Sequence, residues 1–398
     1  MNLRFLRTIS TAVLLSLLLG CTSNNEPVRI VNSKYKPVIN EIRREALFYM
    51  TRSTMPGSTL AVSIKGETVY AEGFGLASTD LNVPASRQTK YRIGEISQTL
   101  TALTYYTMVE KGLLSPDDTI QSYIPDYPYL NHPIQLQQLV DQTSGIRVPT
   151  LGERLYRGNA LSLQTGLQLF SNDSLLFTPG QYHFPTSFSY NVLGAVIEKR
   201  AEKPFQRVVA EMVLDTLRML NTQPDNPFAT IINRSAFFDR DMIAQMTQAT
   251  TLDLRFRLPS EGYLSTAEDL LKLGNALLYG NGISETVRNQ MLTAPKLNEE
   301  FTLPAGNGLL FLLNNRGENY YASRGMVTGG GAMLIILPKE EIVVAWSANI
   351  NDEFDELPGL MVANSFRDFL EGNFKTREEK MKEAEKELSK QNTQELPQ

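Results

Sequence analysis

Cysteine and histidine are almost absent: the 398 residues contain one cysteine, Cys21, and two histidines, His132 and His183. A single cysteine excludes an intrachain disulfide and a cysteine-based metal cluster. The two histidines lack the close spacing of a helical zinc motif, so we expect no metal and no cofactor. Lysine and arginine number 38 against 43 acidic residues. The basic surplus typical of nucleic-acid-binding proteins is therefore missing, and we expect no nucleic-acid partner.

The first 21 residues contain a pattern that gives the lone cysteine a role. Arg4 and Arg7 precede the apolar stretch Ile9–Leu19, whose 11 residues are too few to span a bilayer comfortably. Leu18-Leu19-Gly20-Cys21 follows, and the whole resembles a bacterial lipoprotein signal peptide. The resemblance implies cleavage before Cys21 and lipidation of its thiol. The alternative is an ordinary secretory signal with an incidental cysteine.

From this pattern we expect the mature chain to be held by a lipid rather than to span the membrane. The expected location is a bacterial cell envelope, with the membrane as one partner through Cys21. In a Gram-negative host the resemblance implies the outer membrane, because Thr22 is not an aspartate.

Hydrophobic patterning predicts strands, then helices, then strands again. Apolar runs separated by turn residues predict strands at 58–65 and 67–74, joined at Lys65-Gly66, and at 308–313, 332–337 and 342–348. Helical spacing predicts helices at 37–53, 95–111, 134–142, 162–170, 190–202, 206–217, 266–279 and 357–370. This order predicts one domain of sheet and helices that is interrupted by a mostly helical insertion.

The composition, 42% hydrophobic and 20% charged, is typical of a globular protein with a large core. Glu–Lys pairs three residues apart in the tail predict a solvated helix that frays into a disordered end. We divide the chain into a signal peptide at 1–20, a polar tether at 21–36, an α/β domain at 37–112 and 259–371, a helical insertion domain at 113–258, and a charged tail at 372–398.

Several segments, taken in order along the chain, resemble one enzyme superfamily. They are Tyr91–Leu103, Val109–Asp118, Pro133–Ile146, Pro179-Gly180, Leu193–Lys199 and Gly262–Asp269, followed by the terminal strands with Asn349. Their order and spacing are similar to those of the serine β-lactamase-like and penicillin-binding hydrolases, nearest to the class C β-lactamase-related branch. The resemblance implies an α+β fold, with an antiparallel sheet flanked by helices and an inserted, mostly helical domain. It also implies chemistry that acylates a serine.

The groups that this family uses for catalysis are replaced at all three of its motifs. Gly94 matches the glycine before S-x-x-K, so the serine and lysine positions hold Glu95 and Gln98. Where the family has Tyr-x-Asn, counting from Pro179-Gly180 gives Pro185 and Ser187, and a shift of three gives Phe188-Ser189-Tyr190. Where the family has Lys or His-x-Gly, counting back from Pro338 gives Ser323-Arg324-Gly325. The resemblance therefore implies a degenerate member of the family.

Because these motifs meet in one cleft in the family, we expect a ligand cleft lined by Glu95, Gln98, His183, Ser187, Ser323, Arg324 and Gly325. Glu95 has a structural interpretation, since an acid in the first turn of a helix interacts favourably with the helix dipole. The other interpretation makes it a replacement base or nucleophile. Arg324 either pairs with Glu95 or is a surface arginine. A loop histidine such as His183 is more often structural than catalytic.

Three functions stay open. The favoured one is a catalytically inactive envelope lipoprotein that binds a peptidoglycan fragment, a peptide or another envelope protein. The second is a hydrolase of an ester, peptide or β-lactam that uses Glu95, Ser97, or Ser187 with His183. Ser97 lies about 200° around the helix from Glu95, so we expect it to point away from the cleft. The third is a structural or assembly role for the charged tail.

Overall fold

In the computed structural model, the described residues are 29–128, 131–156, 162–351 and 357–394. The expected signal peptide, Cys21 and the first half of the tether, up to residue 28, lie outside these ranges. Within the described ranges, no helix has both the length and the apolar character that crossing a bilayer requires.

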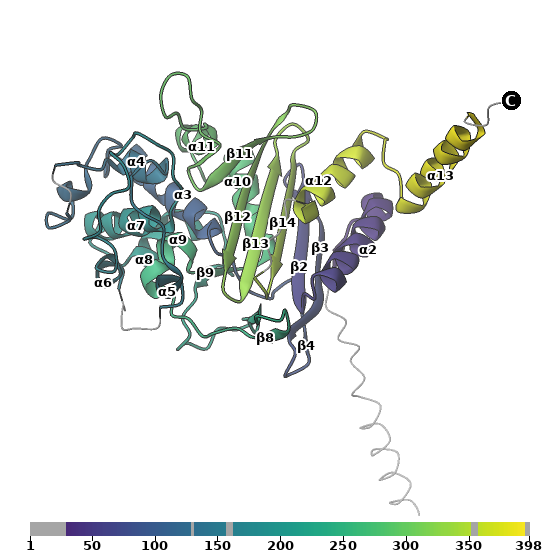
Figure 1. The fold of residues 1–398 in the computed structure, drawn as a ribbon, viewed down its shortest axis with the longest axis horizontal. Coiled ribbons are helices and arrows are strands. Elements are labelled where there is room, and N and C mark those ends of the chain that lie inside the picture. Colours follow the sequence, from purple (N-terminus) through teal and green to yellow (C-terminus); the bar gives the residue numbers. More distant parts are fainter. Residues whose placement is uncertain (1–28, 129–130, 157–161, 352–356, 395–398) are drawn as a thin grey trace, which may run out of the picture.

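A nine-stranded antiparallel sheet forms the centre of the molecule (Figure 1). The hairpin between its second and third strands turns at Lys65 and Gly66, where φ is 53° and 78°, as a tight two-residue turn favours. Strands lie in all five regions where the sequence predicts them. In sheet order they are β1 (Ile30–Val31), β3 (Glu67–Ser78), β2 (Gly57–Ile64), β14 (Ile342–Ala348), β13 (Gly330–Leu337), β12 (Asn319–Val327), β11 (Leu309–Leu313) and β10 (Ala305–Gly306), and β4 (Val83–Pro84) pairs with β3.

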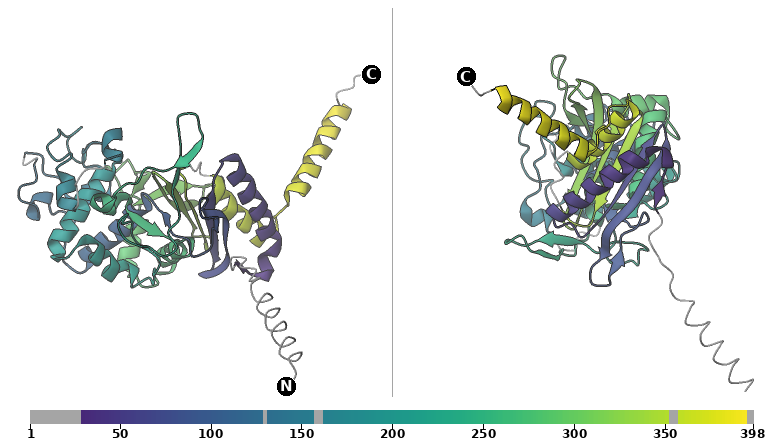
Figure 2. Two further views of the ribbon diagram at one scale, coloured as in Figure 1. Left: turned by 90° about the horizontal axis from the view of Figure 1, so that it is seen from below. Right: turned by 90° about the vertical axis from the view of Figure 1, so that its right-hand side faces the viewer.

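The long helices cover both faces of this sheet. They are α2 (Lys36–Arg52), α3 (Ile96–Glu110), α10 (Ala267–Tyr279) and α12 (Leu357–Leu370). Helices α2 and α12 lie on one face, and α3 and α10 lie on the other (Figures 1 and 2). Apolar side chains including Val38, Trp346 and Phe366 fill the first interface, and others including Leu100 and Leu270 fill the second. Strand β14 is buried along its whole length, which explains its continuous apolar run.

Further helices, of which α7 is as long as α3, and two small sheets make up most of the remaining described chain. The helices are α4 (Leu136–Val140), α5 (Leu151–Arg154), α6 (Leu163–Leu167), α7 (Ser187–Ala201), α8 (Phe205–Val209), α9 (Leu258–Glu261) and α11 (Glu285–Leu292), with 3₁₀ turns η1 (Ser33–Tyr35), η2 (Ile120–Ser122) and η4 (Arg255–Arg257) and a π-helical turn η3 (Ala210–Leu214). Strands β5 (Tyr91–Arg92), β9 (Tyr263–Ser265) and β6 (Gln223–Pro224) form one small sheet, and β7 (Phe238–Arg240) pairs with β8 (Met246–Gln248). Helices α3, α7 and α9 share one apolar core, so the proposed domain boundaries stay a prediction.

The structure differs from the sequence-based expectations in several details, including the shorter helices α4 and α6. Strand β12 was not predicted, because its polar and glycine residues hide the alternation of buried side chains. Helix α7 begins at Ser187 instead of 190, since the Thr186 hydroxyl accepts a hydrogen bond from the Phe188 N–H (3.2 Å) and starts the helix early. The expected helix at 206–217 is a short α-helix followed by the π-helical turn.

The charged tail forms helix α13 (Arg377–Gln394), which leads away from the body of the molecule (Figure 2). Thr376 caps its first turn. The Glu379 N–H donates to the Thr376 hydroxyl and the Thr376 N–H donates to the Glu379 carboxylate, which together form a capping box. The backbone N–H of Arg377 also donates to Glu41 Oε1 in α2 (3.1 Å). The expectation of a charged helix is confirmed.

Candidate functional site

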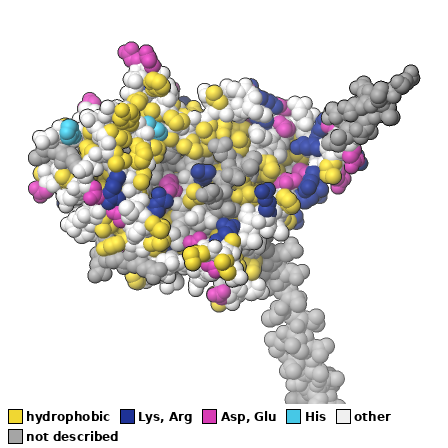
Figure 3. Space-filling view, viewed as in Figure 1, with side chains coloured by type: hydrophobic (Ala, Val, Ile, Leu, Met, Phe, Trp, Pro, Cys, Tyr) yellow, Lys and Arg dark blue, Asp and Glu magenta, His cyan; other side chains and the backbone are white. Residues whose placement is uncertain are grey.

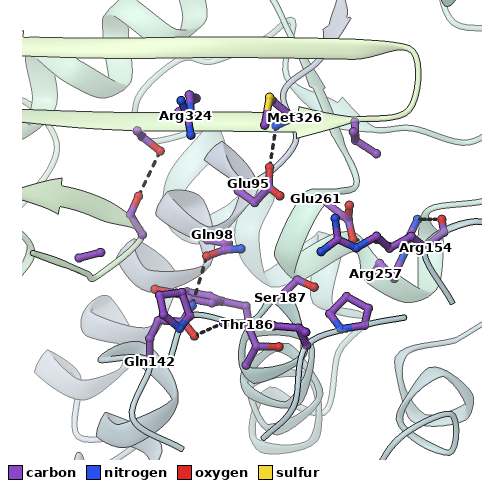
Figure 4. A pocket seen from close by; sticks show the side chains of 18 of the residues that line it. Glu95, Gln98, Gln142, Arg154, Thr186, Ser187, Arg257, Glu261, Arg324 and Met326 are labelled. Atoms are coloured by element: carbon purple, nitrogen blue, oxygen red, sulfur yellow. Dashed lines mark hydrogen bonds and ion pairs between the residues drawn. The ribbon is translucent and has the colours of Figure 1, made fainter. Parts of the chain in front are cut away.

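A cleft of about 600 Å³ opens where the start of α3, strand β12, the start of α7 and the short helices α5 and α9 meet (Figure 4). The three degenerate motifs all contribute to it, although they are far apart in the sequence. Its lining includes Glu95, Gln98, Gln142, Arg154, Pro185, Thr186, Ser187, Arg257, Glu261, Ser323, Arg324 and Met326. Residues of all three motifs thus lie in one cleft, although His183 and Gly325 are not among its lining residues.

Close backbone contact between the start of α3 and strand β12 fixes the position of Glu95. Gly94 has a φ of 50°, and a Cβ atom there would lie 2.4 Å from the Met326 nitrogen. A Cβ atom on Gly325 would lie 1.9 Å from the Ile93 carbonyl oxygen. Only glycine fits on both sides of this contact, and the contact brings the Met326 N–H next to the Glu95 side chain.

A hydrogen bond from the backbone of strand β12 holds the Glu95 carboxylate in place. Its Oε2 accepts a hydrogen bond from the Met326 N–H at 2.6 Å. Burial, and then the negative charge of Glu261, raise the pKa of Glu95 to about 7, against the opposing effects of the Met326 hydrogen bond and the charge of Arg154. A carboxyl group with a pKa near neutrality can exchange a proton under ordinary conditions.

Arg324 does not pair with Glu95. Side chains alternate across a strand, so Arg324 faces away from Ser323, which lines the cleft. Gly325 does not line the cleft as expected, because it packs against the backbone of Ile93 to Glu95. Arg324 lines a small cavity with Met333 and Leu360 on the side of helix α12 and reaches only the rim of the main cleft. In Figure 4 the dashed line from Glu95 runs to Met326.

Neutral amides replace the lysine of the first motif. Gln98 Oε1 accepts a hydrogen bond from Gln142 Nε2 at 3.4 Å, and Gln142 Oε1 accepts one from the Thr186 N–H at 2.9 Å. This chain joins α3 to the start of α7, and none of its members can take up a proton near neutral pH. It can position a ligand but cannot activate a hydroxyl.

The Ser323 side chain of the third motif also makes its hydrogen bonds within the protein. The Ser323 hydroxyl lies 2.8 Å from the Thr99 hydroxyl, and it donates to the Gly308 carbonyl at 3.1 Å. Ser323 is only 3% exposed. No ionisable group accompanies it, so this serine closes the back of the cleft and is not activated.

The remaining serine and histidine candidates do not form a catalytic pair. Ser97 is fully buried, and its hydroxyl accepts a hydrogen bond from the Tyr263 N–H (3.3 Å), which confirms that it points away from the cleft. Ser187 lines the cleft beside Pro185, but His183 does not line it. The His183 ring is half-buried against the Ala305 backbone, and burial lowers its pKa. Among the described residues, no hydrogen bond joins Ser187 to His183.

Sequence reasoning missed three charged side chains that line the cleft, those of Arg154, Arg257 and Glu261. Arg257 and Glu261 lie 3.2 Å apart, Nη1 to Oε1, and Arg154 from α5 lies beside them (Figure 4). Their i,i+4 spacing was a possible signal for the ion pair. Nothing in the sequence indicates that the pair faces the same cleft as Glu95. In the described part of the chain, no cluster of three potential metal ligands is present.

The sheet, the helix carrying the nucleophile position and the facing strand define a β-lactamase/transpeptidase-like fold. Over residues 47–362 the chain matches the Beta-lactamase family, and it therefore belongs to that family. The human protein "Serine beta-lactamase-like protein LACTB, mitochondrial" is 24% identical in an alignment of 294 positions, and the match covers 56% of this chain. The chain spans about half (54%) of the length of that relative.

Solved structures agree on the fold. An octameric penicillin-binding protein homologue from Pyrococcus abyssi superposes with a TM-score of 0.72 at 20% identity, covering 84% of this chain and 78% of that one. A class C β-lactamase superposes with a TM-score of 0.70 at 16% identity, covering 84% of this chain and 98% of that one. The expected fold and family are confirmed.

Proposed function

We propose that this protein is a non-hydrolytic member of the β-lactamase family that binds a ligand in the cleft around Glu95. The observation that carries the proposal is the position of the Glu95 carboxylate, which stands where the family has its serine and bonds to the Met326 N–H at 2.6 Å. A hydroxyl nucleophile needs a base within hydrogen-bond reach. The adjacent positions offer only the amides of Gln98 and Gln142.

The proposal includes a place in the cell. The sequence pattern ending at Cys21 supports a lipoprotein anchored to a bacterial envelope, where a peptidoglycan fragment or another envelope protein is within reach. The similarity in fold to a penicillin-binding protein homologue supports a peptidoglycan-like ligand. The size of the cleft, about 600 Å³, suits a small peptide or sugar-peptide fragment.

A turnover assay tests the proposal. Purified protein is incubated between pH 6 and 8 with a p-nitrophenyl ester, a chromogenic cephalosporin and a D-alanyl-D-alanine peptide, and product is measured. The Glu95→Gln variant is the matched control, because glutamine keeps the shape and an oxygen acceptor for Met326 but cannot move a proton. We expect product formation that is no higher for the natural protein than for the variant.

A second candidate is a hydrolase in which Glu95 is the general base, and the pKa of about 7 favours it. This candidate predicts product in the same assay, with a rate that rises as Glu95 ionises and is lost in Glu95→Gln. Such a result would overturn the non-hydrolytic proposal.

A further inference from the structure

Arg257 has donors that the protein leaves unused. It lies at the end of η4 in the wall of the cleft and is only 3% exposed. Its Nη2 donates to the Arg154 carbonyl at 3.1 Å, and its Nη1 lies 3.2 Å from Glu261 Oε1. Neither Nε nor Nη1 has a hydrogen-bond partner among the described residues. Buried polar atoms are nearly always satisfied, so unused donors beside a cleft indicate a missing acceptor.

While Glu95 is protonated, the charges around Arg257 leave a positive surplus at this end of the cleft. The nearby acids Glu153 and Asp173 are both paired with Arg147: Glu153 accepts two hydrogen bonds from it, at 2.7 and 2.8 Å, and Asp173 forms an ion pair with it. Arg154, which lines the cleft, has no hydrogen bond or ion pair for its guanidinium within the described ranges. Arg257 therefore pairs with Glu261, and the Arg154 guanidinium adds a second positive charge at this end of the cleft.

Charges of both signs are interspersed on the face of the molecule drawn in Figure 3. On that face no broad basic surface competes with the cleft for an anion.

An apolar wall adjoins the two arginines. Val148, Leu151 and Leu155 line the same cleft, and their exposed fractions are 38%, 72% and 40%. Exposed apolar side chains beside a cationic group suit a ligand that has an anionic end and an apolar body.

We propose that this end of the cleft binds a carboxylate that carries a short apolar group. The carboxylate accepts hydrogen bonds from Arg257 and Arg154, and the apolar group lies against Val148, Leu151 and Leu155. A single surplus charge matches a carboxylate better than a phosphate dianion. This inference rests on the proposed binding function and adds the chemical class of the ligand.

Calorimetric titration of the purified protein with hexanoate and with hexanamide tests the proposal at pH 6, where Glu95, with a pKa of about 7, is mostly protonated and hexanoate is still ionised. The two probes share shape and differ in charge. We expect hexanoate to bind about tenfold more tightly, since hydrogen bonds to a charged group contribute more than neutral ones. Arg154→Gln is expected to weaken hexanoate about fivefold and to leave hexanamide unchanged. Equal affinities for the two probes, or no binding of hexanoate, would overturn the proposal.

Glu261→Gln supplies a test with the opposite sign. It removes the carboxylate that competes for Arg257, so hexanoate should bind several-fold more tightly. Arg255→Gln is the matched control, because Arg255 is neighbouring, is already paired with Asp253 and does not line the cleft. It should leave both affinities unchanged, and weaker hexanoate binding by Glu261→Gln would contradict the inference. A product or covalent adduct in the turnover assay would instead refute the non-hydrolytic function.

Discussion

At the scale of single residues, the replacement of a serine by Glu95 changes both the chemistry and the shape of the cleft. The longer side chain reaches the backbone of strand β12 and accepts the Met326 N–H at 2.6 Å. That N–H is then no longer available to polarise a substrate carbonyl, a task for which backbone donors are often used in acyl transfer. The substitution therefore removes the nucleophile and occupies a donor in its vicinity.

Stability should depend on pH through Glu95. Its folded pKa of about 7 lies above the 4.5 of an unperturbed glutamate, so between these values the folded state holds a proton that the unfolded chain has released. The free energy of unfolding should then fall as pH rises through this range, by up to about 3 kcal/mol. Glu95→Gln should lack this fall. Urea denaturation at pH 5 and pH 8 measures it, and an identical change in both proteins would contradict the assignment.

Gly325→Ala should disrupt the close backbone contact between strand β12 and the start of α3. The added Cβ would lie 1.9 Å from the Ile93 oxygen and 2.5 Å from the Glu95 nitrogen, both backbone atoms that cannot rotate away. We expect a loss of about 2–4 kcal/mol in the free energy of unfolding. Gly152→Ala is the control, because its nearest atom is at 4.0 Å and alanine favours the helix. Equal stability of the two variants by denaturant titration would refute the argument.

At the scale of elements, long helices and buried strands could be predicted, and the strand that forms the cleft could not. Helix α3 lies within one residue of its expected bounds, because its apolar residues recur at helical spacing. Strand β12 contains Ser323, Arg324 and Gly325, whose positions are set by the cleft and by close backbone contact. Residues selected for these contacts do not alternate between apolar and polar, so hydrophobic patterning does not predict the strand.

The start of α7 offers a test at this scale. The Thr186 hydroxyl accepts the Phe188 N–H at 3.2 Å and donates to the Arg147 carbonyl at 2.8 Å. Thr186→Ala should cost about 1 kcal/mol of unfolding free energy and weaken ligand binding, since Thr186 lines the cleft. Ser284→Ala removes the equivalent cap of α11, outside the cleft. It should cost a similar amount in thermal unfolding without changing affinity; an equal loss of affinity would contradict the local role of Thr186.

At the scale of the whole molecule, the cleft joins segments that the sequence keeps far apart. Arg154 and Arg257 are brought together by the packing of α5 against η4, and Glu95 comes from α3. The family resemblance could predict the positions of the three motifs because spacing along the chain is kept. It could not predict the arginines, since their meeting depends on how irregular segments fold over the cleft.

The charged tail should contribute little to the stability of the body. Glu378 of α13 lies 3.8 Å from Arg44 with exposed fractions of 76% and 51%, and ion pairs this exposed stabilise weakly. Deletion of 377–398 should shift the Tm by less than about 3 °C in differential scanning calorimetry. A much larger fall would show that α13 is part of the folded core. If the Tm is kept but a complex with an envelope protein is lost, the tail has the assembly role.

The most direct test of the central claim is the intact mass of the protein after incubation with a fluorescent penicillin and with a fluorophosphonate. Both reagents acylate or phosphonylate an activated serine. The account predicts no added mass on the natural protein and a covalent adduct, mapped to position 95, on the Glu95→Ser/Gln98→Lys double variant. An adduct on the natural protein would show a working nucleophile and would contradict the account.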